Sequence, residues 1–235
     1  MIVVEKLDWD SHFFKKEIGR VVVDQIDLAF YEEINDFIAK SSYDLIYLFE
    51  KNVEHRHNPI VEESLKDTKV VYQKTLFSSQ IDSRNCKKYI NSEVKSLDTL
   101  YSLAIASGEY SRYRIDPKFS TQDFVKLYTK WIDNTLNGTI ADDIFVYQEQ
   151  ENIIGLVTAK YAGQKSEIGL IAVEDGHRGK SIGSSLLKTI ECEAIKRGCN
   201  TVSVATQLSN LSACGFYEKN EYKIVNKVNI YHIWK

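Results

Sequence analysis

The feature that most constrains the fold is a glycine-containing stretch between an apolar segment and a helical pattern, IAVEDGHRGKSIGSSLLKTIE at 171–191. Three glycines lie within eight residues, at positions 176, 179 and 183. Apolar residues then recur at helical spacing until Gly198. A strand, a turn of small residues and a helix start predict an anion site, because the first helical turn has unpaired N–H groups and the positive end of the helix dipole.

Two common phosphate-binding patterns do not fit this stretch. A Walker A loop needs a glycine where this chain has Glu174, and a Rossmann fingerprint needs glycine spacings that differ from those present. A third pattern, [RQ]-x-x-G-x-[GA], fits from Arg178 to Gly183 except at Ser181, where it has glycine. From the loop alone, a turn that only links a strand to a helix stays an alternative.

Patterning along the rest of the chain predicts a mixed α/β fold. Helical spacing is expected at 28–40, 96–107, 120–136 and 209–219. An antiparallel meander is expected at 142–173, and strands at 200–207, 222–228 and 230–235. A polar patch at 78–88 predicts a boundary between a small α/β domain, residues 1–90, and a larger domain, residues 91–235.

Composition excludes several classes of function. The net charge is −3 with scattered basic residues, which argues against nucleic-acid binding. No apolar run could span a membrane and the N-terminus lacks a signal-peptide pattern, so a cytoplasmic protein is expected. The four cysteines lack CxxC spacing and are expected to be reduced. The histidines at 55 and 57 have no further ligand nearby, so no metal site is expected.

Two segments together resemble the GNAT acyltransferases, which use acetyl-CoA. The first is the loop with the helix after it, and the second is Asn210–Tyr217, similar to the N-x-x-A-x-x-x-Y motif of that family. The resemblance implies a mostly antiparallel central sheet flanked by helices. It also implies acetyl-CoA as cosubstrate, bound by Ile171, Ala172, Val173, Arg178, Gly179, Lys180, Ser181, Ile182, Gly183 and Asn210.

The same resemblance implies direct acyl transfer to an amine. Backbone N–H groups of strand 168–173 would hold the thioester oxygen, if this strand splays from its neighbour. Tyr217 would hydrogen-bond to, or protonate, the leaving sulfur. A core aromatic residue is the alternative for Tyr217, and Cys214 is expected to serve packing.

The segment GEYSRYRIDPKF at 108–119 is the candidate contact region for the acceptor substrate. Segments in both halves of the chain resemble GNAT enzymes that acetylate a dTDP-linked 4-amino-4,6-dideoxy sugar for bacterial surface polysaccharide. This resemblance implies Arg112, Tyr113 and Phe14 as substrate-binding residues, with the N-terminal domain walling the acceptor site. A peptide or polyamine acceptor and a non-catalytic acyl-CoA-binding module stay alternatives. Monomer and homodimer are both left open.

Overall fold

The computed structural model describes residues 2–53, 59–77, 86–89 and 97–235. The chain forms two compact units. Unit 1 comprises Met1–Val70, Gln207–Leu211 and Asn226–Lys235, and unit 2 comprises Val71–Thr206 and Ser212–Val225. The boundary expected at 78–88 lies mostly outside the described residues, so the division at residue 90 stays a prediction. The histidines at 55 and 57 also lie outside them.

Unit 1 is a small α/β layer with strand order β1-β2-β3-β10-β4. Strands β2 and β3 are parallel, and β3 pairs antiparallel with β10 at the far end of the sequence. Helix α2 covers the core with Tyr31, Ile34 and Ile38. The bounds are β1 Glu5–Lys6, α1 Asp8–Phe14, β2 Ile18–Val23, α2 Leu28–Lys40, β3 Leu45–Glu50, α3 Pro59–Glu63, β4 Leu65–Thr75 and β10 Lys223–Trp234. Strands β4 and β10 each continue into unit 2.

Unit 2 has the strand order β4-β9-β8-β7-β6-β5. Its bounds are β5 Cys86–Lys88, α4 Leu97–Ser107, α5 Arg112–Ile115, α6 Thr121–Leu136, β6 Asp143–Glu149, β7 Asn152–Ala162, β8 Lys165–Val173, η2 Asp175–His177, α7 Ile182–Lys196, β9 Thr201–Gln207 and α8 Leu211–Lys219. Strands β6, β7 and β8 form the predicted antiparallel meander, and β8 pairs parallel with β9.

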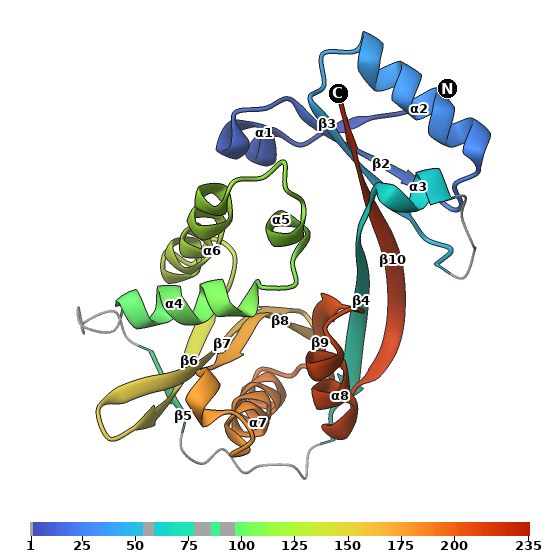
Figure 1. Cartoon of the computed structure of the whole chain (residues 1–235). Coiled ribbons are helices and arrows are strands. Elements are labelled where there is room, and N and C mark those ends of the chain that lie inside the picture. The colour runs from blue at the N-terminus through green and yellow to red at the C-terminus, as the bar shows by residue number, and fades with distance from the viewer. Residues whose placement is uncertain (1, 54–58, 78–85, 90–96) are drawn as a thin grey trace. The chain divides into compact units, whose positions relative to one another are not determined.

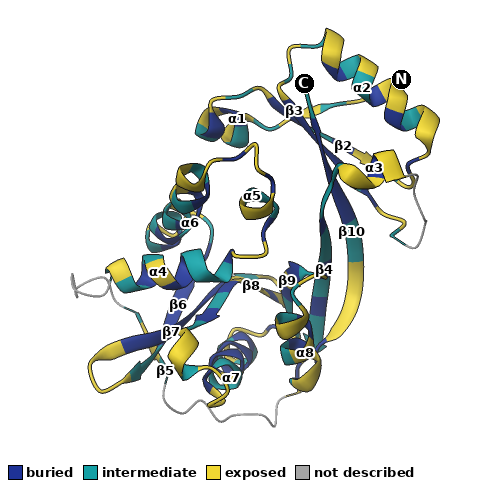
Figure 2. Cartoon of the chain, in the orientation of Figure 1, coloured by how far each residue is buried: buried dark blue, intermediate teal, exposed yellow. Residues whose placement is uncertain are grey.

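Helices cover both faces of the meander. Helices α4 and α6 lie on one side of β7 and β8, and α7 lies on the other (Figure 1). Strand β7 is buried from Ile153 to Ala159, as the dark blue ribbon in Figure 2 shows. A strand covered on both faces has no exposed positions to alternate, which explains its continuous apolar sequence.

Local chemistry explains the elements that were predicted well. Helix α6 begins after Ser120, whose side chain and that of Asp123 form a capping box. Helix α7 ends where Gly198 takes a φ of 78°, which L-residues rarely adopt. Helix α2 matches its predicted bounds, residues 28–40.

Three sequence-based expectations are corrected by the structure. The two closing strands are one strand, β10, because Asn229 donates to the buried carboxylate of Glu50 instead of forming a turn. Asn210 and Tyr217 are seven residues apart, which predicts one helical face, but α8 begins at Leu211, so Asn210 precedes the helix. The β-branched residues at 2–7 predict a strand, but the segment forms only the two-residue strand β1, and helix α1 follows it.

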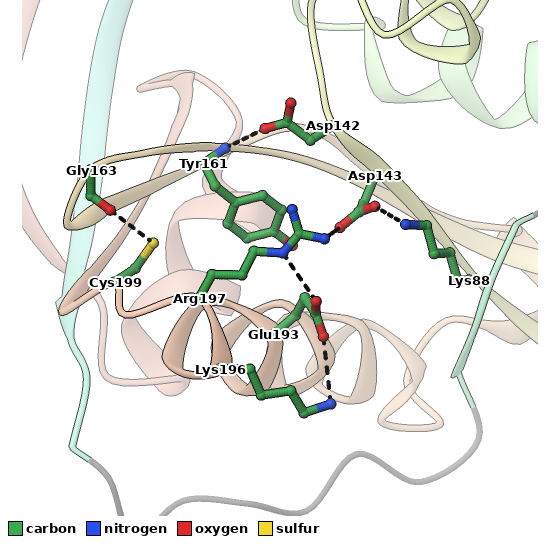
Figure 3. A network of polar contacts seen from close by, with 9 residues as sticks. All are labelled: Lys88, Asp142, Asp143, Tyr161, Gly163, Glu193, Lys196, Arg197 and Cys199. Atoms are coloured by element: carbon green, nitrogen blue, oxygen red, sulfur yellow. Dashed lines mark hydrogen bonds and ion pairs between the residues drawn. The ribbon is translucent and has the colours of Figure 1, made fainter.

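A polar network ties the C-terminal end of α7 to the sheet (Figure 3). The buried carboxylate of Asp143, on β6, accepts from Arg197 at 2.6 Å and pairs with Lys88 at 2.5 Å. The Arg197 guanidinium also donates to Glu193 at 3.0 Å and lies 4.1 Å from the Tyr161 ring centroid. This network fixes the helix whose other end carries the glycine loop.

Candidate active site

The site begins at an irregularity where β7 pairs with β8. Val157 pairs with Ile171, but the next pair is Ala159 with Ile168, so two residues of β8 oppose one residue of β7. The extra residue makes a β-bulge at Gly169 and Leu170. The Leu170 N–H donates to the buried hydroxyl of Thr158 at 2.9 Å, which replaces the missing backbone acceptor. This role of Thr158 could not be predicted from the sequence, because threonine is common in strands.

Beyond the bulge, β8 leaves its other neighbour. The parallel pairing with β9 runs from Lys165–Thr201 to Ile168–Val204 and then stops, although β8 continues to Val173. Strand β8 therefore separates from β9 beyond Ile168, as the binding of a thioester oxygen by its N–H groups requires. Residues 169–173 of β8 have no strand partner in β9, and this unpaired edge of β8 is termed the opening.

Two N–H groups point toward this opening. The Leu170 and Glu174 N–H groups point to β7, since they donate to Thr158 and to the Ile154 carbonyl. Backbone N–H groups alternate in direction along a strand, so those of Ile171 and Val173 point to the opposite edge. Ala172 is buried and its N–H points to β7, so its predicted contact with a cofactor would be through other atoms.

The glycine loop follows at the end of β8. The 3₁₀ turn Asp175–His177 is succeeded by two residues with positive φ, Gly179 at 79° and Ser181 at 62°. The first helical hydrogen bond of α7 runs from the Ser185 N–H to the Ser181 carbonyl. No acceptor for the N–H groups of residues 179–184 occurs in the described part of the chain. The loop therefore presents a run of unpaired donors at a helix N-terminus, as predicted.

Side chains in the loop play different parts. Arg178 folds back along the chain, donating to the Val173 carbonyl at 3.2 Å and pairing with Asp175 at 2.8 Å. Lys180 and Ser181 are exposed, and the Ser181 side chain makes no capping hydrogen bond. Ile182 is buried, so only its backbone is available to a ligand.

Gly183 has a packing role that the sequence did not reveal. A Cβ at this position would lie 3.0 Å from Cε2 and Cζ of Phe216 on α8. The absence of a side chain thus allows α7 and α8 to approach closely. A bulky substitution here would disturb this packing as well as any anion site.

Tyr217 lies on α8, next to Phe216, and is buried. Its ring centroid is 5.5 Å from that of Tyr72 and 6.1 Å from that of Tyr222. The described residues give its hydroxyl no hydrogen-bond partner. Burial, with a smaller contribution from Cys214, raises the pKa of Tyr217 above its ordinary value. The hydroxyl therefore stays protonated and able to donate throughout the neutral range.

The residues proposed for the acceptor lie in separate parts of the chain. On α5, the Arg112 guanidinium stacks over the Tyr113 ring at 4.4 Å and donates to its hydroxyl at 2.6 Å. Tyr113 in turn contacts the buried ring of Phe119, which is not accessible for stacking on a base. Phe14, in unit 1, is also buried and packs edge-on against Phe13. Asn210 belongs to unit 1, where its N–H donates to the Gln207 carbonyl.

Some classes of site are absent from the described residues. They contain no cluster of three or more side chains suited to hold a metal ion. Their helices are too short or too polar to cross a membrane. All four cysteines are free thiols, and Cys214 is buried one turn before Tyr217.

The loop and the opening beside β8 together suit an extended ligand with an anionic group at one end. Residues 107–222 match the model of the Acetyltransferase (GNAT) family. These residues are therefore a GNAT acetyltransferase domain.

Relatives and a solved structure agree with this assignment. The spore coat polysaccharide biosynthesis protein SpsD of Bacillus subtilis is 30% identical over 137 residues, which cover 58% of this chain and 47% of that protein. The dTDP-fucosamine acetyltransferase of Escherichia coli O6:H1 is 29% identical over 123 residues, 52% of each chain. The chain thus spans about half the length of these relatives. A GNAT acetyltransferase from Colwellia psychrerythraea shares the fold, with a TM-score of 0.54 at 13% identity over 88% of this chain and 73% of that one.

Proposed function

We propose that the chain transfers an acetyl group from acetyl-CoA to the amine of a nucleotide-linked amino-deoxy sugar. Two features support this cosubstrate: β8 has no pairing with β9 beyond Ile168–Val204, and this unpaired stretch of β8 leads to a loop with six successive unpaired N–H groups, residues 179–184. The pyrophosphate of CoA would bind the loop, and the pantetheine arm would lie along β8 in the opening.

The chemistry follows from the groups that border the opening. The neutral amine attacks the thioester carbon, and the carbonyl oxygen takes up negative charge. The N–H groups of Ile171 and Val173 point to where this oxyanion would form. The carbon–sulfur bond then breaks, the amine nitrogen loses a proton to water, and the sulfur leaves as a thiolate.

Tyr217 would stabilise this thiolate. A thiolate without a partner is costly in a poorly solvated site, and a tyrosine hydroxyl can donate to it. Burial raises the pKa of Tyr217, so the hydroxyl keeps its proton at neutral pH and can donate to the sulfur. Donation to the sulfur and its protonation, the two roles considered from the sequence, both remain predictions.

The acceptor is supported by the relatives and by α5. One relative is named for spore coat polysaccharide biosynthesis and the other for the acetylation of dTDP-fucosamine. Arg112 offers a cation that suits a diphosphate, and the ring beneath it holds its guanidinium in place. We propose a dTDP-4-amino-4,6-dideoxyhexose as acceptor, with Arg112 and Tyr113 among its contacts.

The test is a panel of amines scored by CoA release from acetyl-CoA. It includes dTDP-4-amino and dTDP-3-amino deoxysugars, a UDP-amino sugar, spermidine and a lysine-containing peptide. We expect the dTDP-4-amino sugar to give the highest kcat/KM. Faster turnover of spermidine or of the peptide would refute the sugar-nucleotide acceptor. Absence of CoA release with every amine would favour an acyl-CoA-binding module.

A further inference from the structure

Trp131 is not part of the glycine loop and has no role in the chemistry proposed above. It lies on α6, half-buried, with its ring stacked near that of Tyr128 at an interplanar angle of 16°. A Cβ built on Gly169 would lie 3.5 Å from the indole Nε1 and 2.9 Å from the Thr158 hydroxyl oxygen. The indole therefore lies directly over the bulge of β8.

The packing around Trp131 holds its ring in this place. Tyr128 fits against Gly108 after the end of α4, where any Cβ would overlap the tyrosine ring. The Tyr101 hydroxyl of α4 donates to Asp133 of α6 at 2.7 Å, two residues beyond Trp131. The indole is thus a fixed surface on the α6 face of the sheet.

The opening beside β8 has two distinct ends. The loop lies at the Val173 end, and the sheet closes again at the Ile168–Val204 pair. A ligand whose phosphates bind the loop must place its opposite end near Gly169. The loop leads into α7 on one face of the sheet, whereas a Cβ on Gly169 would point to α6 on the other. The group that reaches through the opening therefore meets Trp131.

We infer that the Trp131 indole closes the acyl end of the cofactor site and limits the length of the acyl chain. This inference rests on the proposed acyl-CoA function. With glycine at position 169, the indole and the Thr158 hydroxyl border the bulge, and no β8 side chain lies between them. An acetyl group bound beside the bulge would lie against this ring, whereas each further methylene would press into it.

The experiment compares the binding of acetyl-CoA and hexanoyl-CoA by titration calorimetry, so that it does not depend on the acceptor. The wild-type chain should bind acetyl-CoA more tightly. Trp131→Ala should lower the ratio of acetyl-CoA affinity to hexanoyl-CoA affinity by roughly tenfold or more. One extra methylene of a ligand is worth about this much discrimination in an apolar pocket. Trp131→Leu keeps an apolar side chain on α6 and should shift the ratio in the same direction by less.

The matched control is Tyr101→Phe. It removes the hydrogen bond between α4 and α6 but leaves the indole unchanged, so thermal stability should fall while the affinity ratio stays at the wild-type value. An equal shift in the control would assign the effect to the position of the helix and overturn the inference. Folded Trp131→Ala and Trp131→Leu variants with the wild-type ratio would also overturn it. Absence of CoA binding in the wild-type chain would refute the proposed function itself.

Discussion

Ser181 offers a matched pair of substitutions at the anion site. It has a φ of 62°, a conformation that asparagine and aspartate tolerate better than most residues. Ser181→Asn and Ser181→Asp introduce side chains of nearly the same shape, but only the second adds a negative charge beside the unpaired N–H groups. We expect CoA affinity to be at least ~10-fold lower in Ser181→Asp than in Ser181→Asn, because like charges within a few ångströms repel by more than 1 kcal/mol.

Calorimetry with CoA measures this difference directly. Equal CoA affinities in the two folded variants would place the pyrophosphate elsewhere. This pair is preferable to Gly183→Asp, since a side chain at Gly183 would also collide with Phe216.

Tyr217→Phe tests the hydroxyl separately from the ring. The aromatic packing against Tyr72 and Tyr222 is retained, so folding and acetyl-CoA affinity should stay near wild type. We expect kcat to fall by about 10²-fold, the size typical of a lost acid catalyst. A wild-type kcat for this variant in the acceptor assay would mean that Tyr217 is a core aromatic residue without a catalytic role.

Single residues also mark where sequence reasoning stops. The unpaired donors of the loop were predictable, because a helix N-terminus after small residues has one physical consequence. The positions of Thr158 and Trp131 at the bulge were not, because they depend on a register shift between strands that no local pattern shows. The packing of Gly183 against Phe216 joins residues 33 positions apart and was equally hidden.

At the scale of elements, Asp143 links β6, β5 and α7. Asp143→Asn should lower the free energy of unfolding by about 2 kcal/mol, because it removes a buried charge that pairs with Arg197 and Lys88. The neighbouring change Asp142→Asn is the control, since Asp142 is exposed and asparagine can still accept from the Tyr161 N–H. Urea denaturation compares the two.

The control should change the unfolding free energy much less than Asp143→Asn does. Equal effects would mean that the network in Figure 3 does not stabilise α7 specifically. Elements of this kind were predicted well where their own sequence specifies them, as with the capping box of α6. Strand β10 was divided in two, because burial of Asn229 against Glu50 is a contact between distant segments.

At the scale of the molecule, buried tyrosines in both units predict sensitivity to alkali. Burial raises the pKa of Tyr161, Tyr222 and Tyr231, and a hydrogen bond to Asp133 raises that of Tyr101 to about 12. The unfolded chain loses these protons near pH 10, before the folded chain does. Stability should therefore be unaffected by these groups below about pH 10 and should fall as the pH rises above it.

Urea unfolding at pH 9 and pH 11 tests this sign. Tyr161→Phe should lose less stability between the two values than the wild type, because one such group is removed. An unchanged or higher midpoint at pH 11 would contradict the assignment. The place of the C-terminal strand β10 in unit 1, paired to β3, was beyond sequence patterning for the same reason as the bulge: the partners lie far apart in the chain.

Backbone N–H groups of the loop and of β8 are proposed to bind acetyl-CoA. Amide hydrogen exchange, measured by mass spectrometry with and without acetyl-CoA, reports on these groups themselves. We expect slower exchange in the bound state for residues 179–184, whose N–H groups have no partner in the described structure, and for Ile171 and Val173. Binding of acetyl-CoA with unchanged exchange at these residues would contradict this proposal.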